Sequence, residues 1–172
     1  MAGAGHLVRR FFSSLRPGGA PRADDEWACA QLLPAEVELW RKMSGPDRRH
    51  AVGVARRVEL ALGHEATRPV LAAALLHDVG KVASGLRTFG RVIATLSGKA
   101  AGTGYARAWS NAGGFTRKVG LYLRHADLGG DMLALAGSDP ITVGWAREHH
   151  LPEDEWTIPR AIGAALKAAD DD

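Results

Sequence analysis

The stretch that decides the fold is PVLAAALLHDVGK, which occupies residues 69–81. Its first eight residues are apolar on every side of a helix, a pattern that predicts a helix buried all round. The last turn of that helix carries His77 and Asp78 into the interior, where an unpaired charge is costly. A metal ion, an Arg or Lys side chain, or a set of backbone donors would satisfy the pair, and a metal is favoured if more His and Asp side chains converge on it.

The end of this buried helix is where the His-Asp pair is expected to act. Adjacent residues of an α-helix diverge by about 100°, so the doublet shares one centre most easily where the helix is ending. Gly80 is expected to provide a sharp exit, because a residue without Cβ tolerates the left-handed conformation.

The length, composition and charge of the chain limit its number of domains, its compartment and the kind of ligand it binds. A chain of 172 residues is most simply one domain, large enough to bury a hydrophobic core without stabilising disulfides or metal ions. Its single cysteine, Cys29, excludes an internal disulfide and fits a reducing compartment, so we expect a cytoplasmic protein. The formal charge of +3 suits a small phosphorylated or nucleotide-like ligand, but it gives no strong nucleic-acid signal. The sequence does not indicate the oligomeric state.

Residues 1–24 are expected to form an N-terminal arm. Apolar residues fall there at helical spacing with three arginines between them, which fits an amphipathic helix with weak peripheral membrane contact. A helix docked on its own domain, or a frayed arm before the Gly- and Pro-rich linker 16–22, fits the same pattern. No apolar run approaches the roughly 20 residues that span a bilayer, and the arm lacks the features of a secretory signal.

Residues 25–172 are expected to form a single all-α domain of about six to eight helices, because no β-type alternation persists beyond a few residues. Pro34 and Pro140 fit first helical turns, and Gly63 fits a helix end. The glycine-rich residues 83–114 are interpreted as an insertion that caps the pocket, or as an irregular surface subdomain. The expected helices span residues 25–43, 46–62, 66–78, 115–124, 132–136, 140–149 and 158–172, with further short helices at 89–96 and 105–111.

Other His and Asp residues lie on the inner faces of their helices. Three apolar stripes each include one residue of a type that binds metal, so these residues are expected to point inward. His125 directly follows another helix, and His150 completes a doublet. Any one such histidine is more often a hydrogen-bonded core residue, but five of them with two inward aspartates favour a metal site. The stripes are His50, Val54, Val58 and Leu62; Ile141, Trp145 and His149; and Ile162, Leu166 and Asp170.

The order of these residues resembles the HD-domain metal-dependent phosphohydrolase superfamily. His50 comes first, His77 and Asp78 follow in an HDVGK context, and Asp170 comes last. The resemblance covers roughly residues 46–170, and the full ordered set is more specific than the HDVGK stretch alone.

The remaining histidines are similar to those of the HD-GYP branch, whose members cleave cyclic dinucleotides. His125 and the doublet at 149–150 follow the ligand order of that branch. The loop after the doublet, LPEDEW at 151–156, lacks the Gly-Tyr-Pro signature, so cyclic-dinucleotide specificity is not supported. Pro46 stands where some members place a glutamate, which argues against a third metal.

The resemblance implies an HD-domain-like helical bundle that holds one or two divalent transition-metal ions. Asp78 would bridge two metals and Lys81 would reach a phosphate oxygen, so these two are the candidate catalytic residues. Mixed His and Asp ligands suit Mn, Fe, Co or Ni better than Mg. The implied metal ligands are His50, His77, Asp78, His125, His149, His150 and Asp170.

The sequence therefore predicts a hydrolase, a metal-dependent phosphohydrolase or phosphodiesterase that cleaves a phosphoester or phosphodiester of a nucleotide-like substrate. Two metals about 3.5 to 4 Å apart, bridged by a carboxylate, present an activated hydroxide in line with phosphorus and neutralise the developing charge. Arg124 or Arg117 would help Lys81 to hold the phosphate. Two alternatives remain open, a metal-containing nucleotide sensor or binding module without turnover, and a structural domain with packed histidines.

Overall fold

The protein is all-α, as predicted, over the residues that the computed structural model describes, which are 19–86, 90, 94–95 and 105–171. Within them, no helix is both long enough and apolar enough to cross a membrane. Within the described residues, the α-helices with defined first and last residues are α2 (Arg22–Ala30), α3 (Pro34–Lys42), α4 (Gly45–Leu62), α5 (Arg68–Leu76), α7 (Tyr105–Ser110), α8 (Gly114–Leu123), α9 (His125–Leu135), α10 (Pro140–Glu148) and α11 (Arg160–Asp171). The 3-10 helices are η1 (Gly63–Glu65), η2 (Val79–Ser84) and η3 (Glu153–Glu155).

Prolines and short capping side chains determine where several helices begin. Each of α3, α4, α5 and α10 carries a proline in its first turn, where no backbone N–H is needed for the helix. The Ser44 hydroxyl accepts a hydrogen bond from the N–H of Asp47 at 3.3 Å, and the Asp139 carboxylate accepts one from the N–H of Ile141 at 2.8 Å. Gly63 ends α4 with a φ of 53°, as its position predicted.

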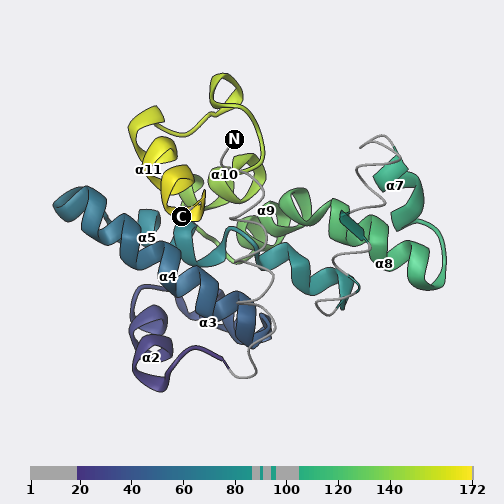
Figure 1. Cartoon of the computed structure of the whole chain (residues 1–172), viewed down its shortest axis with the longest axis horizontal. Coiled ribbons are helices and arrows are strands. Elements are labelled where there is room, and N and C mark those ends of the chain that lie inside the picture. Colours follow the sequence, from purple (N-terminus) through teal and green to yellow (C-terminus); the bar gives the residue numbers. More distant parts are fainter. Residues whose placement is uncertain (1–18, 87–89, 91–93, 96–104, 172) are drawn as a thin grey trace.

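The apolar helix α5 lies at the centre of the core. Seven of its nine residues are buried, as the all-round apolar pattern predicted. Helices α4 and α10 pack on α5, while α11 packs on α4 and α9 packs on α10 (Figure 1). Trp40 and Trp145 are fully buried and are the largest side chains of this core. The polar pair His77 and Asp78 therefore follows α5 while still inside the core, and the two residues are 1% and 4% exposed.

Some helix boundaries differ from the predicted ones. The expected helix at 25–43 is divided into α2 and α3, because Leu33 precedes a proline and is extended, with a ψ of 156°. His125 does not end a helix but begins α9, and the expected short helix at 132–136 is the last part of α9. Gly129 and Gly130 have low helix propensity, which hides the first half of α9 from a reading of the sequence.

Gly80 is needed for close packing and not for a left-handed backbone. A Cβ atom at this position would lie 1.9 Å from the carbonyl oxygen of His125 and 2.6 Å from the nitrogen of Gly129. The glycine with positive φ at the end of η2 is Gly85, at 60°. The backbone of η2 therefore lies directly on α9, which brings Asp78 next to His125.

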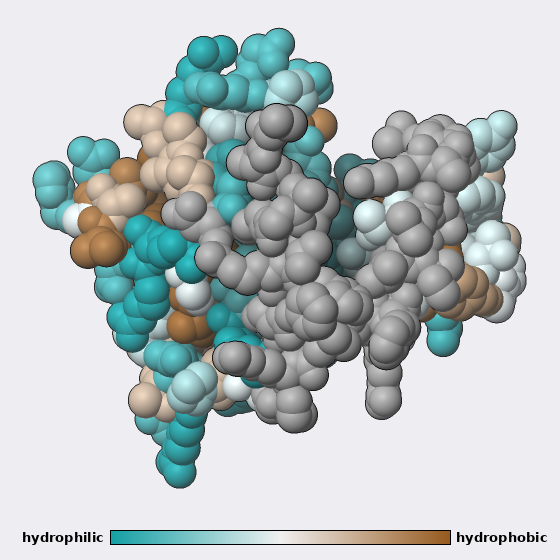
Figure 2. Space-filling model, in the orientation of Figure 1, coloured by the Kyte–Doolittle hydropathy of each residue, from teal (hydrophilic) through white to brown (hydrophobic). Residues whose placement is uncertain are grey.

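Helices α7 and α8 pack on each other and form a lobe at the end of the molecule away from α4 and α11 (Figure 1). A small separate cluster of Leu86, Ala94 and Val119 lies in this lobe. Figure 2 shows apolar residues at the surface of this end beside pale, weakly polar ones. Residues 1–18 of the predicted arm and residues 87–89, 91–93 and 96–104 of the predicted insertion at 83–114 lie outside the described residues, so the predicted domain organisation stays a prediction.

Candidate metal centre

All seven predicted metal ligands come together at one place in the fold. They are contributed by α4, by the residues that follow α5, by the first residue of α9, by the residues that follow α10 and by α11. Five of the seven side chains are buried, while that of His50 is 23% exposed and His150 lies at the surface. The ligand residues are His50, His77, Asp78, His125, His149, His150 and Asp170.

One group of three potential ligands consists of His50, His77 and Asp170. Their ligand atoms all lie within 4.8 Å of one another. The Asp170 Oδ1 atom lies 2.8 Å from Nε2 of His50 and 3.6 Å from Nε2 of His77. This group joins α4 to α11 and to the end of α5, so it combines residues from both ends of the domain.

A second group consists of His125, His149 and His150, whose ligand atoms also lie within 4.8 Å of one another. The Nε2 atoms of His125 and His150 are 3.1 Å apart. His149 is buried and His150 is exposed, so the doublet reaches from the core to the surface. Three imidazoles in this arrangement form a typical set of ligands for a divalent transition metal.

The Asp78 carboxylate lies between the two groups. Its Oδ1 atom is 3.4 Å from Nε2 of His125 and 3.7 Å from Nε2 of His149. Its Oδ2 atom is 3.4 Å from Nε2 of His77. Each carboxylate oxygen therefore faces one of the two groups, an arrangement that suits a bridging ligand. The ammonium of Lys81 also contacts Oδ2.

Three histidines of the centre are held in the same way. The Nδ1 atom of His77, of His125 and of His149 bonds to the backbone carbonyl three residues earlier. A carbonyl only accepts, so Nδ1 carries the proton and Nε2 of a neutral ring presents a lone pair to the centre. Backbone contacts of this kind fix the orientation of metal-binding imidazoles. The accepting carbonyls are those of Ala74, Tyr122 and Ala146, at 2.9, 2.7 and 3.0 Å.

Two of the inward nitrogen atoms have no partner among the described residues. Nε2 of His77 and Nε2 of His149 are both buried without a hydrogen bond. A buried polar atom without a partner is rare and calls for a bound group. Because lone pairs of nitrogen face carboxylate oxygens here, a cation is the group that this donor set fits.

The charge of Asp78 is stabilised by its neighbours. Burial raises the pKa of this carboxyl, but Lys81 and His77, together with the His125 and His149 imidazoles, bring the pKa well below its ordinary value. The same ion pair affects Lys81. Burial lowers the pKa of its ammonium, but the Asp78 carboxylate raises that pKa above the ordinary value. Asp78 is therefore ionised across the physiological pH range.

The histidines of the centre titrate in different directions. Burial lowers the pKa of His149. Although His150 reaches the surface, its imidazole is partly enclosed by its neighbours, and this desolvation together with the repulsion of His149 and His125 lowers the pKa of His150 to about 3. For His77, burial lowers the pKa but the carboxylates of Asp78 and Asp170 raise it above the ordinary value. His149 and His150 are thus neutral at pH 7, as histidine ligands of a metal must be.

Of the three cations expected to hold phosphate, Lys81 alone lies at the centre. Arg124 donates a hydrogen bond to the Ser110 hydroxyl on α7 at 3.1 Å, and Arg117 is exposed on α8. Neither guanidinium contacts a ligand residue in the described part of the chain.

A buried polar side chain that periodicity does not reveal is Glu148, the residue directly before the His doublet. It is 7% exposed and accepts hydrogen bonds from the N–H and hydroxyl of Thr157, the first at 2.8 Å. A further bond comes from the N–H of Ile158. Glu148 thereby ties the loop after the His doublet to the start of α11. Its position directly before the doublet was the one sequence signal for this role.

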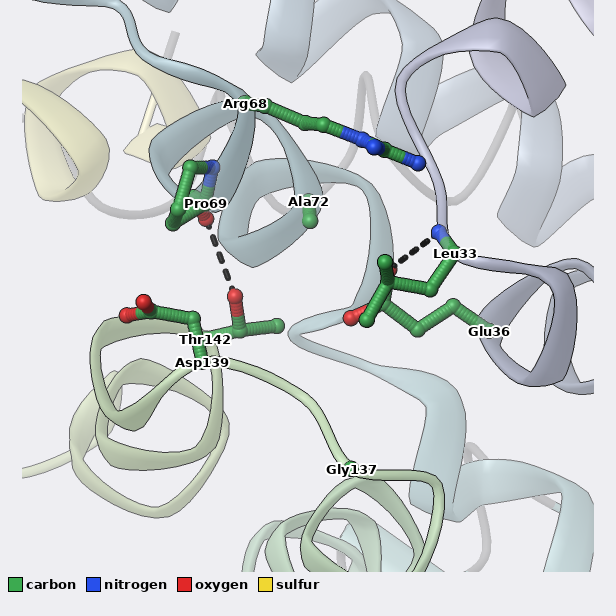
Figure 3. Close-up of a pocket in the computed structure, with 8 residues that line it drawn as sticks. All are labelled: Leu33, Glu36, Arg68, Pro69, Ala72, Gly137, Asp139 and Thr142. Carbon is green, nitrogen blue, oxygen red and sulfur yellow. Dashed lines mark hydrogen bonds between the residues drawn. The ribbon is translucent and has the colours of Figure 1, made fainter.

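A cavity of about 260 Å³ lies at the other end of α5 and is separate from the centre (Figure 3). The Glu36 carboxylate lines it and accepts a hydrogen bond from the N–H of Leu33 at 2.7 Å. Across the cavity, the Thr142 hydroxyl donates to the carbonyl of Pro69 at 3.0 Å. The first bond caps the start of α3 and the second joins α5 to α10, so both polar side chains stabilise the fold around the cavity.

Comparison of the chain with models of protein families, with curated proteins and with solved structures finds no match. The side chains of the centre and their geometry therefore carry the functional conclusion.

Proposed function

We propose that this protein is a metal-dependent phosphohydrolase of the HD-domain kind. It would hold one or two divalent transition-metal ions and hydrolyse a phosphoester or phosphodiester of a nucleotide-like substrate. The observation that carries the proposal is the ionised, buried Asp78, with one oxygen facing each of two groups of three potential ligands.

The donor set fits divalent transition metals better than any other group. Imidazole nitrogen and carboxylate oxygen together suit Mn, Fe, Co or Ni, whereas Mg prefers oxygen ligands and retains its waters. The two unpartnered nitrogens, on His77 and His149, belong to different groups, which supports a capacity for two ions. One ion would be held by His50, His77 and Asp170, the other by His125, His149 and His150, and Asp78 would contact both.

When bound, such ions polarise the phosphoryl group and supply a hydroxide nucleophile near neutral pH. The residues of the chain perform the remaining tasks. The carbonyl contacts on Nδ1 keep the imidazoles in one orientation, so little reorganisation is needed on binding. Burial of Asp78 excludes bulk water, which strengthens the electrostatic interactions of the centre.

Lys81 is the cation that would bind a substrate phosphate. Its side chain is 14% exposed, so the ammonium lies at the boundary between the buried carboxylate and the surface. With metal on Asp78, the ammonium would repel the metal and turn to the nearest anion, which is a phosphate oxygen of the substrate. Lys81 would then orient the phosphate and neutralise part of its charge.

Two measurements test the proposal. Elemental analysis of protein purified without chelator is expected to find one to two transition-metal ions per chain. A generic aryl phosphodiester and a panel of nucleotides are then assayed with Mn, Fe, Co and Ni, and activity is expected to be lost in Asp78→Ala and kept in Asp131→Ala, which changes an exposed carboxylate. Metal content with tight nucleotide binding but no turnover would favour the sensor. Absence of metal would favour a structural domain.

A further inference from the structure

The overall charge of +3 conceals a strong local asymmetry. Residues 79–126 contain eight Lys and Arg residues and no Asp or Glu, whereas the rest of the chain contains 14 Lys and Arg residues against 19 Asp and Glu. The lobe formed by α7 and α8 lies in this segment. Arg87, Arg91 and Lys99 of the segment lie outside the described residues, so the placed cations of the lobe are Arg107, Arg117, Lys118 and Arg124.

The basic residues of the lobe differ from those elsewhere in their pairing. Arg107, Arg117 and Lys118 are exposed, and none of them has a carboxylate partner in the part of the chain that the structure describes. Exposed cations on the other helices commonly form ion pairs. Such pairs are Arg22 with Glu26, Arg41 with Glu38, Arg56 with Glu59, Arg147 with Asp131 and Lys167 with Asp171. The lobe therefore presents uncompensated positive charge.

Exposed aromatic rings belong to the same two helices as these cations. Tyr105 is 58% exposed and Phe115 is 50% exposed, and both belong to the lobe. The ring of Trp109 lies 6.1 Å from that of Tyr105 at a tilt of 32°. Positive charge interleaved with exposed aromatic rings is the pattern by which proteins bind unpaired bases and their phosphates.

The lobe continues into the metal centre through α8. Lys118 and Tyr122 are four residues apart on α8, so they lie on one face of that helix. Helix α8 ends at Leu123, and His125 begins α9 directly after the turn residue Arg124. The Tyr122 ring lies 5.6 Å from the His125 ring, so this face of α8 ends beside a candidate metal ligand.

We propose that the exposed surface of α7 and α8 binds single-stranded nucleic acid. Resting on the function proposed above, we assign the phosphodiester of that strand as the substrate of the centre. A single strand fits better than a duplex for two reasons. Its bases are free to stack on Tyr105 and Phe115, and a single backbone is thin enough to approach Asp78, which is only 4% exposed.

The test is fluorescence anisotropy of a labelled 12-residue oligothymidylate and a matching oligouridylate, with the full chain in EDTA so that binding is measured without turnover. The variant Arg117→Gln/Lys118→Gln is compared with Lys42→Gln/Arg160→Gln, which removes two exposed cations outside the lobe. Loss of two phosphate contacts is expected to reduce the slope of log K against log salt by about 1.4. The control pair is expected to keep the wild-type slope.

A second pair of variants separates stacking from charge. Tyr105→Ala/Phe115→Ala is expected to weaken binding about tenfold or more while leaving the salt slope unchanged, because stacking is not electrostatic. Leu60→Ala/Leu135→Ala removes two apolar side chains that are 88% and 90% exposed elsewhere, and it is expected to bind as the wild type does.

The outcomes distinguish this inference from the proposed function. Absence of oligonucleotide binding at 50 mM salt, or equal binding by the Arg117/Lys118 variant, would overturn the inference even if the aryl phosphodiester is hydrolysed. Binding to phosphatidylserine vesicles without binding to oligonucleotides would overturn it in favour of a lipid surface. Oligonucleotide binding without cleavage under any metal would support the surface and overturn the substrate assignment.

Discussion

Loading the centre with a divalent metal is expected to stabilise the protein. A ligand that binds only the native state contributes about 2.7 kcal/mol at a free concentration 100 times its Kd. For a chain of this length, 1 kcal/mol shifts Tm by roughly 2 to 4 °C. One ion would therefore raise Tm by about 5 to 11 °C over the chelator-treated protein, and a second ion would add a similar amount.

The variant Asp78→Asn is expected to remove most of this response. It keeps the size of the side chain but removes the charge that faces both ligand groups. In the metal-free protein it also leaves the Lys81 ammonium, whose side chain is 14% exposed, without its counterion. Breaking a buried pair in this way costs about 3 to 5 kcal/mol. The metal-free variant is thus expected to melt well below the wild type, and its Tm is expected to rise only slightly with metal.

The assay is thermal unfolding followed by circular dichroism, first in EDTA and then in a titration with Mn, Co and Ni. Asp131→Asn is the control, because this exposed carboxylate pairs with Arg147 on the surface and an exposed pair contributes at most about 1 kcal/mol. An unchanged Tm of the wild type with all of these metals would refute the assignment of a metal centre. An equal metal response in Asp78→Asn would refute the bridging role.

Three further predictions concern the fold and its dependence on pH. Gly80→Ala is expected to destabilise the protein by about 3 kcal/mol in urea unfolding, because the new Cβ would lie 1.9 Å from a backbone oxygen of α9. The control Gly53→Ala is expected to be tolerated, because the nearest atom to its Cβ belongs to a flexible arginine side chain at 3.4 Å. Trp145→Ala is expected to cost about 3 to 5 kcal/mol in the same assay, and Leu60→Ala on the surface almost nothing. Folding lowers the pKa of His150 to about 3, so below about pH 6.5 the unfolded chain binds a proton at this residue that the folded chain does not. The metal-free protein is therefore expected to lose stability as pH falls from about 6.5 toward 3. His150→Gln is expected to show a shallower loss of Tm over that range.

Helical periodicity was enough to orient several side chains correctly. The stripes that contain His50, His149 and Asp170 predicted that all three point inward, and the structure brings them to the same centre as His77 and Asp78. The reason is that a helix of about 3.6 residues per turn must bury its apolar stripe, and a polar residue on that stripe is buried with it.

Periodicity could not show which inward residues meet. His50 and Asp170 are 120 residues apart and contact each other across α4 and α11. Arg124 is adjacent in sequence to a candidate ligand, yet its guanidinium contacts Ser110 on α7. Glu148 was not recognised because its role depends on a loop that returns to it nine residues later.

The sequence by itself determined that the chain is helical, that α5 is buried all round, and that a His-Asp pair leaves this helix inside the core. Only the tertiary structure decided that the candidate ligands form two groups of three with Asp78 between them. It also decided that the positive charge of α7 and α8 lies at one end of the molecule, on helices of which one ends beside His125. Local patterns record which side of each helix is buried, whereas the partner of a buried side chain depends on how distant helices pack.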